Sequence, residues 1–230
     1  MKYSKITVDN KYFIKRFSHN QRFIFCENII KKYKFKKLLD YGSGDGYLIK
    51  ILSKNFKKSV FHIYEPDKNM ILEIRKNLRG INKKIFFNRK KLKKNSYDIV
   101  CVNEVFEHLS YSGVNESIKI LKKILNKNGI LIISVPIEVG LAGFLKNLIR
   151  YLINQKHSNT NIKNVIKSLL YLKIKRPNLE YNESHIGFNY LSFIKMLKQK
   201  GINITKISFS PFGFFGGLIN SQVYIEARFK

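Results

Sequence analysis

The stretch Leu38-Leu39-Asp40-Tyr41-Gly42-Ser43-Gly44-Asp45-Gly46-Tyr47-Leu48 decides the fold. An apolar run ends in an acid, passes through a glycine-rich turn and enters the start of a helix. Glycines in such a turn let the backbone approach a ligand where a Cβ would collide, and the free N–H groups of the following helix point at the same spot. The stretch therefore predicts a strand, a turn and a helix that together bind a nucleoside-type cofactor.

A second acid supports this interpretation. Glu65 ends the apolar run Val60-Phe61-His62-Ile63-Tyr64 and follows Gly44 by about 20 residues, the spacing at which a strand-end carboxylate meets ribose hydroxyls. The charge of Asp40 then distinguishes between cofactors, because an acid beside the turn repels a pyrophosphate and attracts a sulfonium or an ammonium. The turn also lacks the third glycine of the G-x-G-x-x-G spacing, which disfavours NAD.

Strands alternate with helices along the chain, which predicts an α/β fold with a doubly wound, mostly parallel seven-stranded sheet. Ligands of such sheets bind beyond the carboxyl ends of the strands. The residues that suggest chemistry lie at such ends or just past them: Asp40, Glu65, Asn103, Glu104 and His108. The expected strands are 37–41, 59–64, 84–87, 97–102, 130–135, 202–208 and 222–228, and the expected helices include 18–34 (capped by Ser18), 45–54, 67–78, one from about Glu104, 115–125 and one ending near 200.

The glycine turn resembles that of the class I S-adenosylmethionine-dependent methyltransferases. The resemblance covers about residues 18–136 and 183–228 and is closest to the small-molecule group that includes the ubiquinone-biosynthesis O-methyltransferases. Three further segments carry it: Asn103-Glu104-Val105-Phe106-Glu107-His108-Leu109 resembles an E-x-x-E-H segment, Lys127-Asn128-Gly129-Ile130-Leu131 the turn into strand five, and His185-Ile186-Gly187-Phe188 an H-x-x-F segment. The resemblance implies a Rossmann-like fold whose last strand is antiparallel.

The resemblance also implies roles in binding S-adenosylmethionine. It places Asp40, Gly42, Gly44 and Gly46 along the methionine portion, Glu65 on the ribose and Asn103 against the methionine chain. The family usually has an acid after strand three that contacts the adenine amino group. Here Asn88 stands in that segment, and it could accept the same hydrogen bond.

Two histidines are the candidate catalytic residues. A histidine near neutral pKa can remove the acceptor proton during methyl transfer, and His108 and His185 both fall at the expected ligand edge. The alternatives are structural: His108 braces the helix after strand four, and His185 fixes the return of the preceding segment. We assign no metal ligand; as an alternative, the resemblance allows Glu104, Glu107 and His108 to form a divalent-cation site.

Residues 137–183 predict a helical lid inserted after strand five. One helix has an apolar face with Leu141, Phe144, Leu145, Leu148, Ile149 and Leu152 and an opposite basic side with Lys146 and Arg150; a shorter helix covers 165–172. The sequence favours packing of the apolar face on the sheet, and a helix lying in a membrane interface is the alternative. The aromatic connection 210–217 packs on this lid, contacts substrate or touches a membrane.

Length and composition limit the number of domains, the possible binding partners and the cellular compartment. The chain has 230 residues, 44% of them hydrophobic, which suits one domain over 1–230, and its net charge is +29. Compositional drift accounts for this charge, or drift combined with nucleic acid or an anionic membrane surface as a partner. Cys26 and Cys101 lack metal or redox spacing and suit a reducing compartment. Without a secretory signal or a spanning segment, we expect a cytoplasmic protein, peripheral at the inner membrane face in the membrane alternative.

The leading functional hypothesis is therefore O-methylation of a small-molecule, glycan or lipid-linked acceptor. The alternatives are an RNA methyltransferase, which the charge favours, and a non-catalytic cofactor-binding or membrane-surface module. Against RNA, no D/N-P-P-Y/W segment follows strand four. Against a decayed site, both Asp40 and Glu65 are intact.

Overall fold

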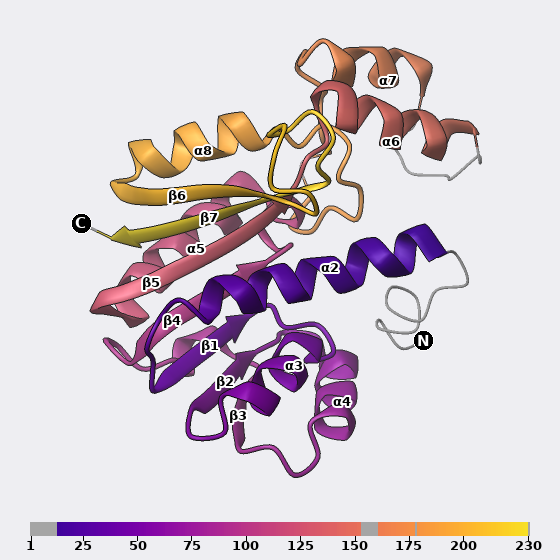
Figure 1. Ribbon diagram of the computed structural model, residues 1–230. Coiled ribbons are helices and arrows are strands. Elements are labelled where there is room, and N and C mark those ends of the chain that lie inside the picture. Colours follow the sequence, from indigo (N-terminus) through magenta and orange to yellow (C-terminus); the bar gives the residue numbers. More distant parts are fainter. Residues whose placement is uncertain (1–12, 153–160, 178, 230) are drawn as a thin grey trace. The chain divides into compact units, whose positions relative to one another are not determined.

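The chain forms a seven-stranded sheet with helices in the connections (Figure 1). The computed structural model describes residues 13–152, 161–177 and 179–229. The strands follow the order β3-β2-β1-β4-β5-β7-β6. Their bounds are β1 Lys37–Tyr41, β2 Val60–Tyr64, β3 Lys83–Phe86, β4 Tyr97–Asn103, β5 Leu125–Pro136, β6 Ile202–Ser210 and β7 Gln222–Phe229.

Strand direction confirms the predicted fold class. β1 runs parallel to β2 and to β4, and β2 runs parallel to β3. β7 is antiparallel to β6, with Ile202 opposite Phe229 and Ser210 opposite Gln222. The near-continuous burial of β1 and β4 suits inner strands that helices cover on both faces, because such strands need apolar side chains on both sides.

The helices agree with the expected ones except at a few ends. α2 begins at Phe13, so Ser18 lies inside the helix and does not cap it. The helix expected from Glu104 is only a 3₁₀ turn, η2 Phe106–His108, and α5 follows it. β5 begins at Leu125 and includes the expected turn at 126–129. The helices are α2 Phe13–Ile30, α3 Tyr47–Asn55, α4 Lys68–Asn77, α5 Tyr111–Ile124, α6 Gly140–Leu152, α7 Ile162–Leu169 and α8 Tyr190–Gln199, with a second 3₁₀ turn, η1 Arg89–Lys91.

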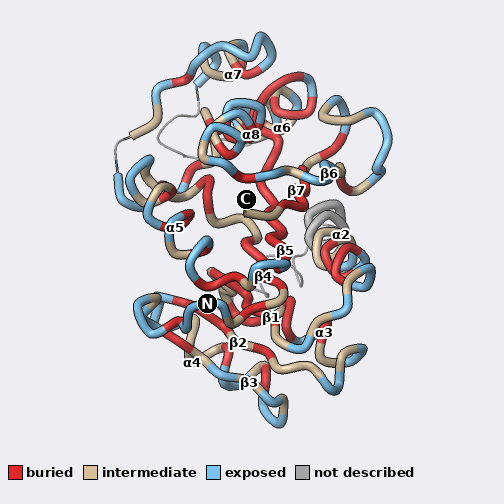
Figure 2. The backbone as a smooth tube through the Cα atoms, turned by 90° about the vertical axis from the view of Figure 1, so that its left-hand side faces the viewer, coloured by how far each residue is buried: buried red, intermediate tan, exposed pale blue. Residues whose placement is uncertain are grey.

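The chain divides into two compact units. The first extends through Asn103 and also includes Lys119–Ile133, and the second comprises Glu104–Ile118 and the chain from Ser134 onward. Each has its own buried apolar residues. In the first these include Leu38, Leu39, Ile63 and Val100, and in the second Val135, Leu197, Val223 and Ile225. Figure 2 colours all buried positions of the backbone red. Cys26 and Cys101 are both buried and are free cysteines.

The division separates the two groups of predicted site residues. The glycine turn, Asp40, Glu65, Asn88 and Asn103 belong to the first unit, and His108, His185 and the segment 137–183 belong to the second. The second unit continues directly from Asn103 along the chain, so only four residues lie between Asn103 and His108 in the sequence. Among the described residues, no helix is both long enough and apolar enough to cross a membrane.

Candidate functional site

The glycine turn adopts a backbone that requires glycine. Gly42, Gly44 and Gly46 have φ angles of 79°, 59° and 82°, in the left-handed region that side chains with a Cβ rarely enter. A Cβ on Gly46 would also approach Cδ1 of Leu78 to 3.0 Å. The N–H of Gly42 donates to the carbonyl of Tyr64 at 2.8 Å, which anchors the turn on the neighbouring strand. The turn thus presents bare backbone just past the end of β1, as predicted.

Asp40 lies at the base of this turn and is 2% exposed. Its Oδ2 accepts a hydrogen bond of 2.6 Å from the hydroxyl of Ser43. Burial raises the pKa of Asp40 to about 7, and the nearby carboxyls of Glu65 and Asp45 raise it further while the Ser43 hydrogen bond opposes them. A cation bound beside Asp40 would favour its ionised form. The site is therefore suited to a positively charged ligand.

The carboxylate of Glu65 bridges the glycine turn and the chain that follows β2. One oxygen, Oε2, accepts from the N–H of Gly44 at 2.8 Å, and the other, Oε1, accepts from the N–H of Asp67 at 3.0 Å. Burial raises the pKa of Glu65, and these two backbone hydrogen bonds act against it. Each oxygen keeps a further lone pair for a ligand hydroxyl. The acid that the sequence pairs with a ribose is thus also part of the wall of the turn.

The two predicted asparagines differ in their surroundings. Asn103 is partly buried at the end of β4, and its side chain meets Sγ of Cys26 at 3.7 Å. Asn88 is exposed and caps η1, where its Oδ1 accepts from the N–H of Lys90 at 2.9 Å. Asn88 therefore offers an adenine amino group only the second lone pair of its oxygen.

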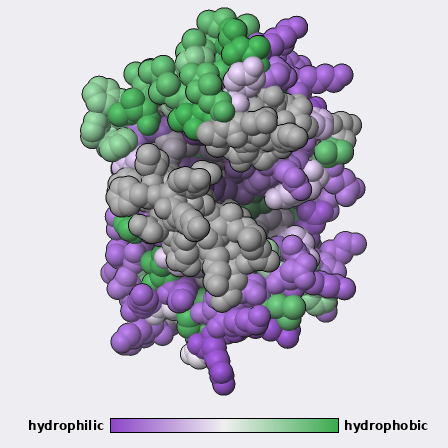
Figure 3. Space-filling model, turned by 90° about the vertical axis from the view of Figure 1, so that its right-hand side faces the viewer, coloured by the Kyte–Doolittle hydropathy of each residue, from purple (hydrophilic) through white to green (hydrophobic). Residues whose placement is uncertain are grey.

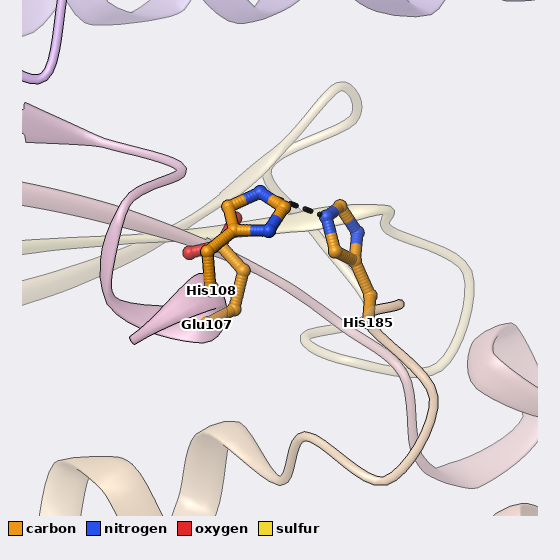
Figure 4. A group of neighbouring side chains, drawn as sticks. All are labelled: Glu107, His108 and His185. Carbon is orange, nitrogen blue, oxygen red and sulfur yellow. Dashed lines mark hydrogen bonds between the residues drawn. The ribbon is translucent and has the colours of Figure 1, made fainter. Parts of the chain in front are cut away.

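In the second unit, the two predicted histidines face each other (Figure 4). Nε2 of His185 lies 3.2 Å from Nε2 of His108. On its other side, His108 Nδ1 is 2.7 Å from the carbonyl oxygen of Asn182, and the imidazole stacks on Tyr181. Nδ1 of His185 lies 4.0 Å from a carboxylate oxygen of Glu138. The chain thus brings together two histidines that are 77 residues apart.

A family model for the methyltransferase domain matches residues 15–169. The chain belongs to the class I S-adenosylmethionine-dependent methyltransferases. The match begins before the glycine turn and continues through Glu107 and His108, so it covers the predicted cofactor residues and one of the two histidines. The methyltransferase uses S-adenosylmethionine as its cofactor. A comparison with curated protein sequences gives no match.

Solved structures confirm the fold of the methyltransferase. The PH0226 protein of Pyrococcus horikoshii aligns with a TM-score of 0.65 over 99% of this chain and 96% of its own, at 13% identity. Magnesium protoporphyrin IX methyltransferase from Synechocystis, solved with bound SAH, aligns with a TM-score of 0.61 over 95% and 88%, at 14% identity. The methyltransferase domain of bacterial CtHen1 aligns with a TM-score of 0.62 over 90% and 97%, also at 14% identity.

The hydrogen bonds of the methyltransferase's histidine pair constrain the ring protons. A carbonyl oxygen only accepts, so Nδ1 of His108 carries the hydrogen and its Nε2 holds a lone pair. If His185 donates from Nε2 to that lone pair, then its own Nδ1 lone pair faces the Glu138 carboxylate. If His185 instead carries its hydrogen on Nδ1, toward Glu138, two lone pairs face each other across 3.2 Å. The second arrangement needs a cation at the Nε2 atoms.

Both histidines are neutral at neutral pH. Burial lowers the pKa of His185 to about 4, although Glu138 and Glu104 act in the opposite direction. Burial also lowers the pKa of His108, and the Asn182 carbonyl opposes this. A base works best when its pKa is near the working pH, so His185 is a weak proton acceptor in this state. A neutral imidazole is, however, the form that binds metal ions.

Glu107 completes a group that could hold a metal ion. Ligand atoms of Glu107, His108 and His185 all lie within 4.8 Å of one another. This set differs from the one that the sequence suggests, because His185 takes the place of Glu104. The carboxylate of Glu104 is engaged by the side-chain amide of Gln222, and its residue has a left-handed φ of 52° at the point where β4 ends. Imidazole and carboxylate donors suit zinc, manganese or iron.

Sequence reasoning missed Glu138 and Arg176. Glu138 is fully buried and holds Lys146 and Arg150, and Arg176 donates to the backbone carbonyls of Glu107 and Ser184. Arg176 thereby joins the two histidine segments. A signal for Glu138 does exist in the sequence, since Lys146 and Arg150 are one helical turn apart and Glu138 is the acid that precedes them.

Proposed function

We propose that this methyltransferase acts on an oxygen of a small-molecule, glycan or lipid-linked acceptor. We further propose that His108 and His185 bind the acceptor hydroxyl, directly or through a metal ion, and assist the loss of its proton. The observation that supports this most directly is the pair of neutral imidazoles whose Nε2 atoms face each other at 3.2 Å. When His185 carries its hydrogen on Nδ1, both Nε2 atoms hold lone pairs, and these attract either the proton of a hydroxyl or a metal ion that binds the hydroxyl.

The chemistry needs two things of the protein. The cofactor, when bound, would supply a methyl group for in-line transfer to an acceptor oxygen, and its sulfur would keep the electrons of the carbon–sulfur bond as a neutral thioether. Asp40 would hold the cationic cofactor before the reaction. The acceptor oxygen must also lose a proton. The protein therefore contributes in two ways: it aligns the acceptor oxygen with the methyl group, and it helps to remove the proton.

The geometry of this group also suits a bound divalent cation, because Glu107 brings a carboxylate oxygen within 4.8 Å of ligand atoms of the two histidines. Such an ion, when bound, lowers the pKa of a hydroxyl so that it ionises near neutral pH. His108 and His185 would hold it through Nε2, with Glu107 as the third ligand. Asn182 and Glu138 would fix the two rings through their Nδ1 atoms, which is a common arrangement around metal-bound histidines.

The experiment is an acceptor screen with S-adenosylmethionine that carries an isotopically labelled methyl group. Purified protein is incubated with lipid, small-molecule and RNA fractions of a cell extract, with and without Mn²⁺. We expect label in a lipid or small-molecule fraction, on oxygen, and its loss with His108→Asn and His185→Asn. Label confined to the RNA fraction, which the net charge of +29 would favour, would refute the proposed acceptor class.

A further inference from the structure

The first helix of the segment 137–183 has its apolar side outward. Leu141, Leu145, Ile149 and Leu152 form one stripe along α6 and are 43%, 48%, 58% and 71% exposed. The opposite side of α6 is turned inward and carries small and polar residues, of which Ala142, Gly143 and Asn147 are buried. The expected packing of the apolar face on the sheet is therefore wrong for this stripe.

Glu138 explains this orientation. Its carboxylate is buried, and it accepts from Nζ of Lys146 at 2.9 Å and from a guanidinium nitrogen of Arg150 at 2.6 Å. A buried carboxylate needs such partners, because an unpaired charge away from water is costly. Gly143 lets the helix approach closely, since a Cβ there would collide with the backbone of Glu138. Holding the basic side inward leaves the apolar stripe in solvent.

The second helix repeats this arrangement. The exposed side of α7 has Ile162 and Ile166, and it continues into the C-cap residue Leu170. The buried side has Val165 and Ser168. Ser168 satisfies its hydroxyl by donating to the carbonyl of Val165 at 2.7 Å. Exposed residues continue past the helix with Tyr171 and Leu172. Two neighbouring helices with apolar stripes in solvent are unusual for a monomeric soluble protein, and such patches mark binding surfaces.

The connection between β6 and β7 adds aromatic side chains to the same unit. Its exposed residues are Phe212, Phe214, Phe215, Leu218 and Ile219. The end of this connection is tied to the start of the lid segment, because the N–H of Ile137 donates to the carbonyl of Ser221 at 3.0 Å. Figure 3 shows apolar side chains gathered in a green region at the top of the view. We call these residues of α6, α7 and the connection the apolar surface.

The charged side chains in the sequence that carries α6 and α7 are all of one sign. Between Glu138 and Glu180 the sequence has no acidic residue, although it has eight lysines and arginines. Lys146 and Arg150 are paired with Glu138, but Lys163 and Lys173 are exposed beside the stripes, and Lys167 is partly exposed on α7. Helices with an exposed apolar face and flanking lysines bind anionic lipid surfaces, whereas a second copy of this chain would bring the same positive charge.

We propose that α6, α7 and the β6–β7 connection dock the methyltransferase on an anionic membrane surface, with the apolar stripes and the phenylalanines in the headgroup region and the lysines on the lipid phosphates. Side chains of this kind, apolar or aromatic with lysine beside them, are typical of interfacial segments. The docking does not depend on the acceptor class, and it would bring a lipid-linked acceptor to the protein without extraction from the bilayer.

The test is co-sedimentation with vesicles of phosphatidylglycerol and phosphatidylcholine, compared with vesicles of phosphatidylcholine alone. We expect binding to the first and little to the second. Leu145→Ser with Ile149→Ser should weaken binding by at least about tenfold. Lys163→Gln with Lys167→Gln and Lys173→Gln should weaken it by about a hundredfold, since each lysine near an anionic leaflet contributes about fivefold.

The matched control is Leu72→Ser, which removes a similarly exposed leucine from α4 in the first unit and should leave vesicle binding unchanged. Calorimetric binding of S-adenosylmethionine and thermal unfolding of every variant separate lost docking from lost folding or a lost cofactor site. Vesicle binding that the Leu145/Ile149 variant retains in full would overturn the proposal. So would a dimer in analytical ultracentrifugation that this variant dissociates, because the apolar surface would then bind a second copy.

Discussion

The hydroxyl of Ser43 donates a 2.6 Å hydrogen bond to the carboxylate of Asp40, which lies almost wholly out of contact with water. Burial raises the pKa of Asp40 to about 7, so a large share of the molecules carry this acid protonated at neutral pH before the cofactor binds. The folded protein therefore keeps an acid that is unfavourable in its charged form. This is a cost that a ligand with positive charge would remove.

Asp40→Asn should stabilise the protein above neutral pH. The folded-state pKa of Asp40 is raised above its unfolded value, so wild-type stability falls as pH rises from about 4 to about 7 and stays reduced above that. The amide lacks this charge and can still accept from Ser43. We expect a gain on the order of 2 kcal/mol at pH 8 and little change at pH 4, measured by denaturant unfolding.

The control for this substitution is Asp98→Asn. Burial alone would raise the pKa of Asp98, but hydrogen bonds from the N–H groups of Lys37 and Lys36 and from Asn126 bring it below its usual value. Its carboxylate thus contributes stability above its unfolded pKa, and this is lost as pH falls through the folded pKa. The asparagine variant should be destabilised at neutral pH. Equal effects of both substitutions would show that burial of Asp40 is not what raises its pKa.

Binding of S-adenosylmethionine should release a proton below about pH 7. If Asp40 faces the cationic cofactor, it must ionise on binding, so affinity should rise with pH up to about 7 and level off above it. Titration calorimetry in two buffers with different ionisation enthalpies measures the proton released. S-adenosylhomocysteine, whose sulfur is neutral, is the control and should release less. Asp40→Asn should abolish the release and weaken binding at least about tenfold, since it removes a buried charge partner; unchanged affinity would exclude Asp40 from the cofactor site.

Mn²⁺ should bind at the histidine pair. We expect His185→Asn and His108→Asn each to weaken Mn²⁺ binding by about tenfold or more. Electron paramagnetic resonance of the free ion measures this binding. Binding should also weaken as pH falls, because protons compete for the imidazoles. His62→Asn is the control, since His62 pairs with Tyr97 in the first unit. If all three variants bind Mn²⁺ as the wild type does, the two histidines serve as hydrogen-bond partners only.

Glu138→Gln should destabilise the protein strongly. Although burial would raise the pKa of Glu138, the charges of Lys146 and Arg150 hold it well below its usual value. The stability it contributes is present above its unfolded pKa and is lost as pH falls through the folded one. Removal of the charge leaves two cations without their partner, so we expect a loss of about 3 kcal/mol at pH 7. Glu180→Gln, at an exposed acid, should change stability by less than about 0.5 kcal/mol.

Much of the fold could be predicted because its signals are local. Local backbone structure is indicated by the apolar run before Asp40, by the three glycines and by the carboxylate of Glu65. The structure has the strand, turn and helix that these features predict. For His108 and His185, the sequence predicts only that both lie at the ligand edge of the sheet, and not that they contact each other. Their 3.2 Å approach depends on the return of the chain after α7, which no local pattern encodes.

The orientation of α6 could not be predicted from its apolar stripe. Amphipathic patterning says that two faces differ, and the usual assumption is that the apolar face turns inward. Here the opposite orientation occurs together with one buried acid, Glu138, whose carboxylate pairs with Lys146 and Arg150 on the inward side of the helix. The residues of these two interactions are eight and twelve positions apart in the sequence. The periodic pattern within the helix does not include Glu138, so it leaves the orientation of the helix open.

Dependence on one carboxylate also bears on how such a protein can evolve. A change of one nucleotide converts a glutamate codon to a valine codon, and the Glu138→Val side chain would have no need of Lys146 or Arg150. The helix would then be free to turn about its axis, with its leucines toward the interior and its basic side chains toward water. A relative with an apolar residue at this position should have the apolar side of this helix turned inward, so a single mutational step would separate the two orientations.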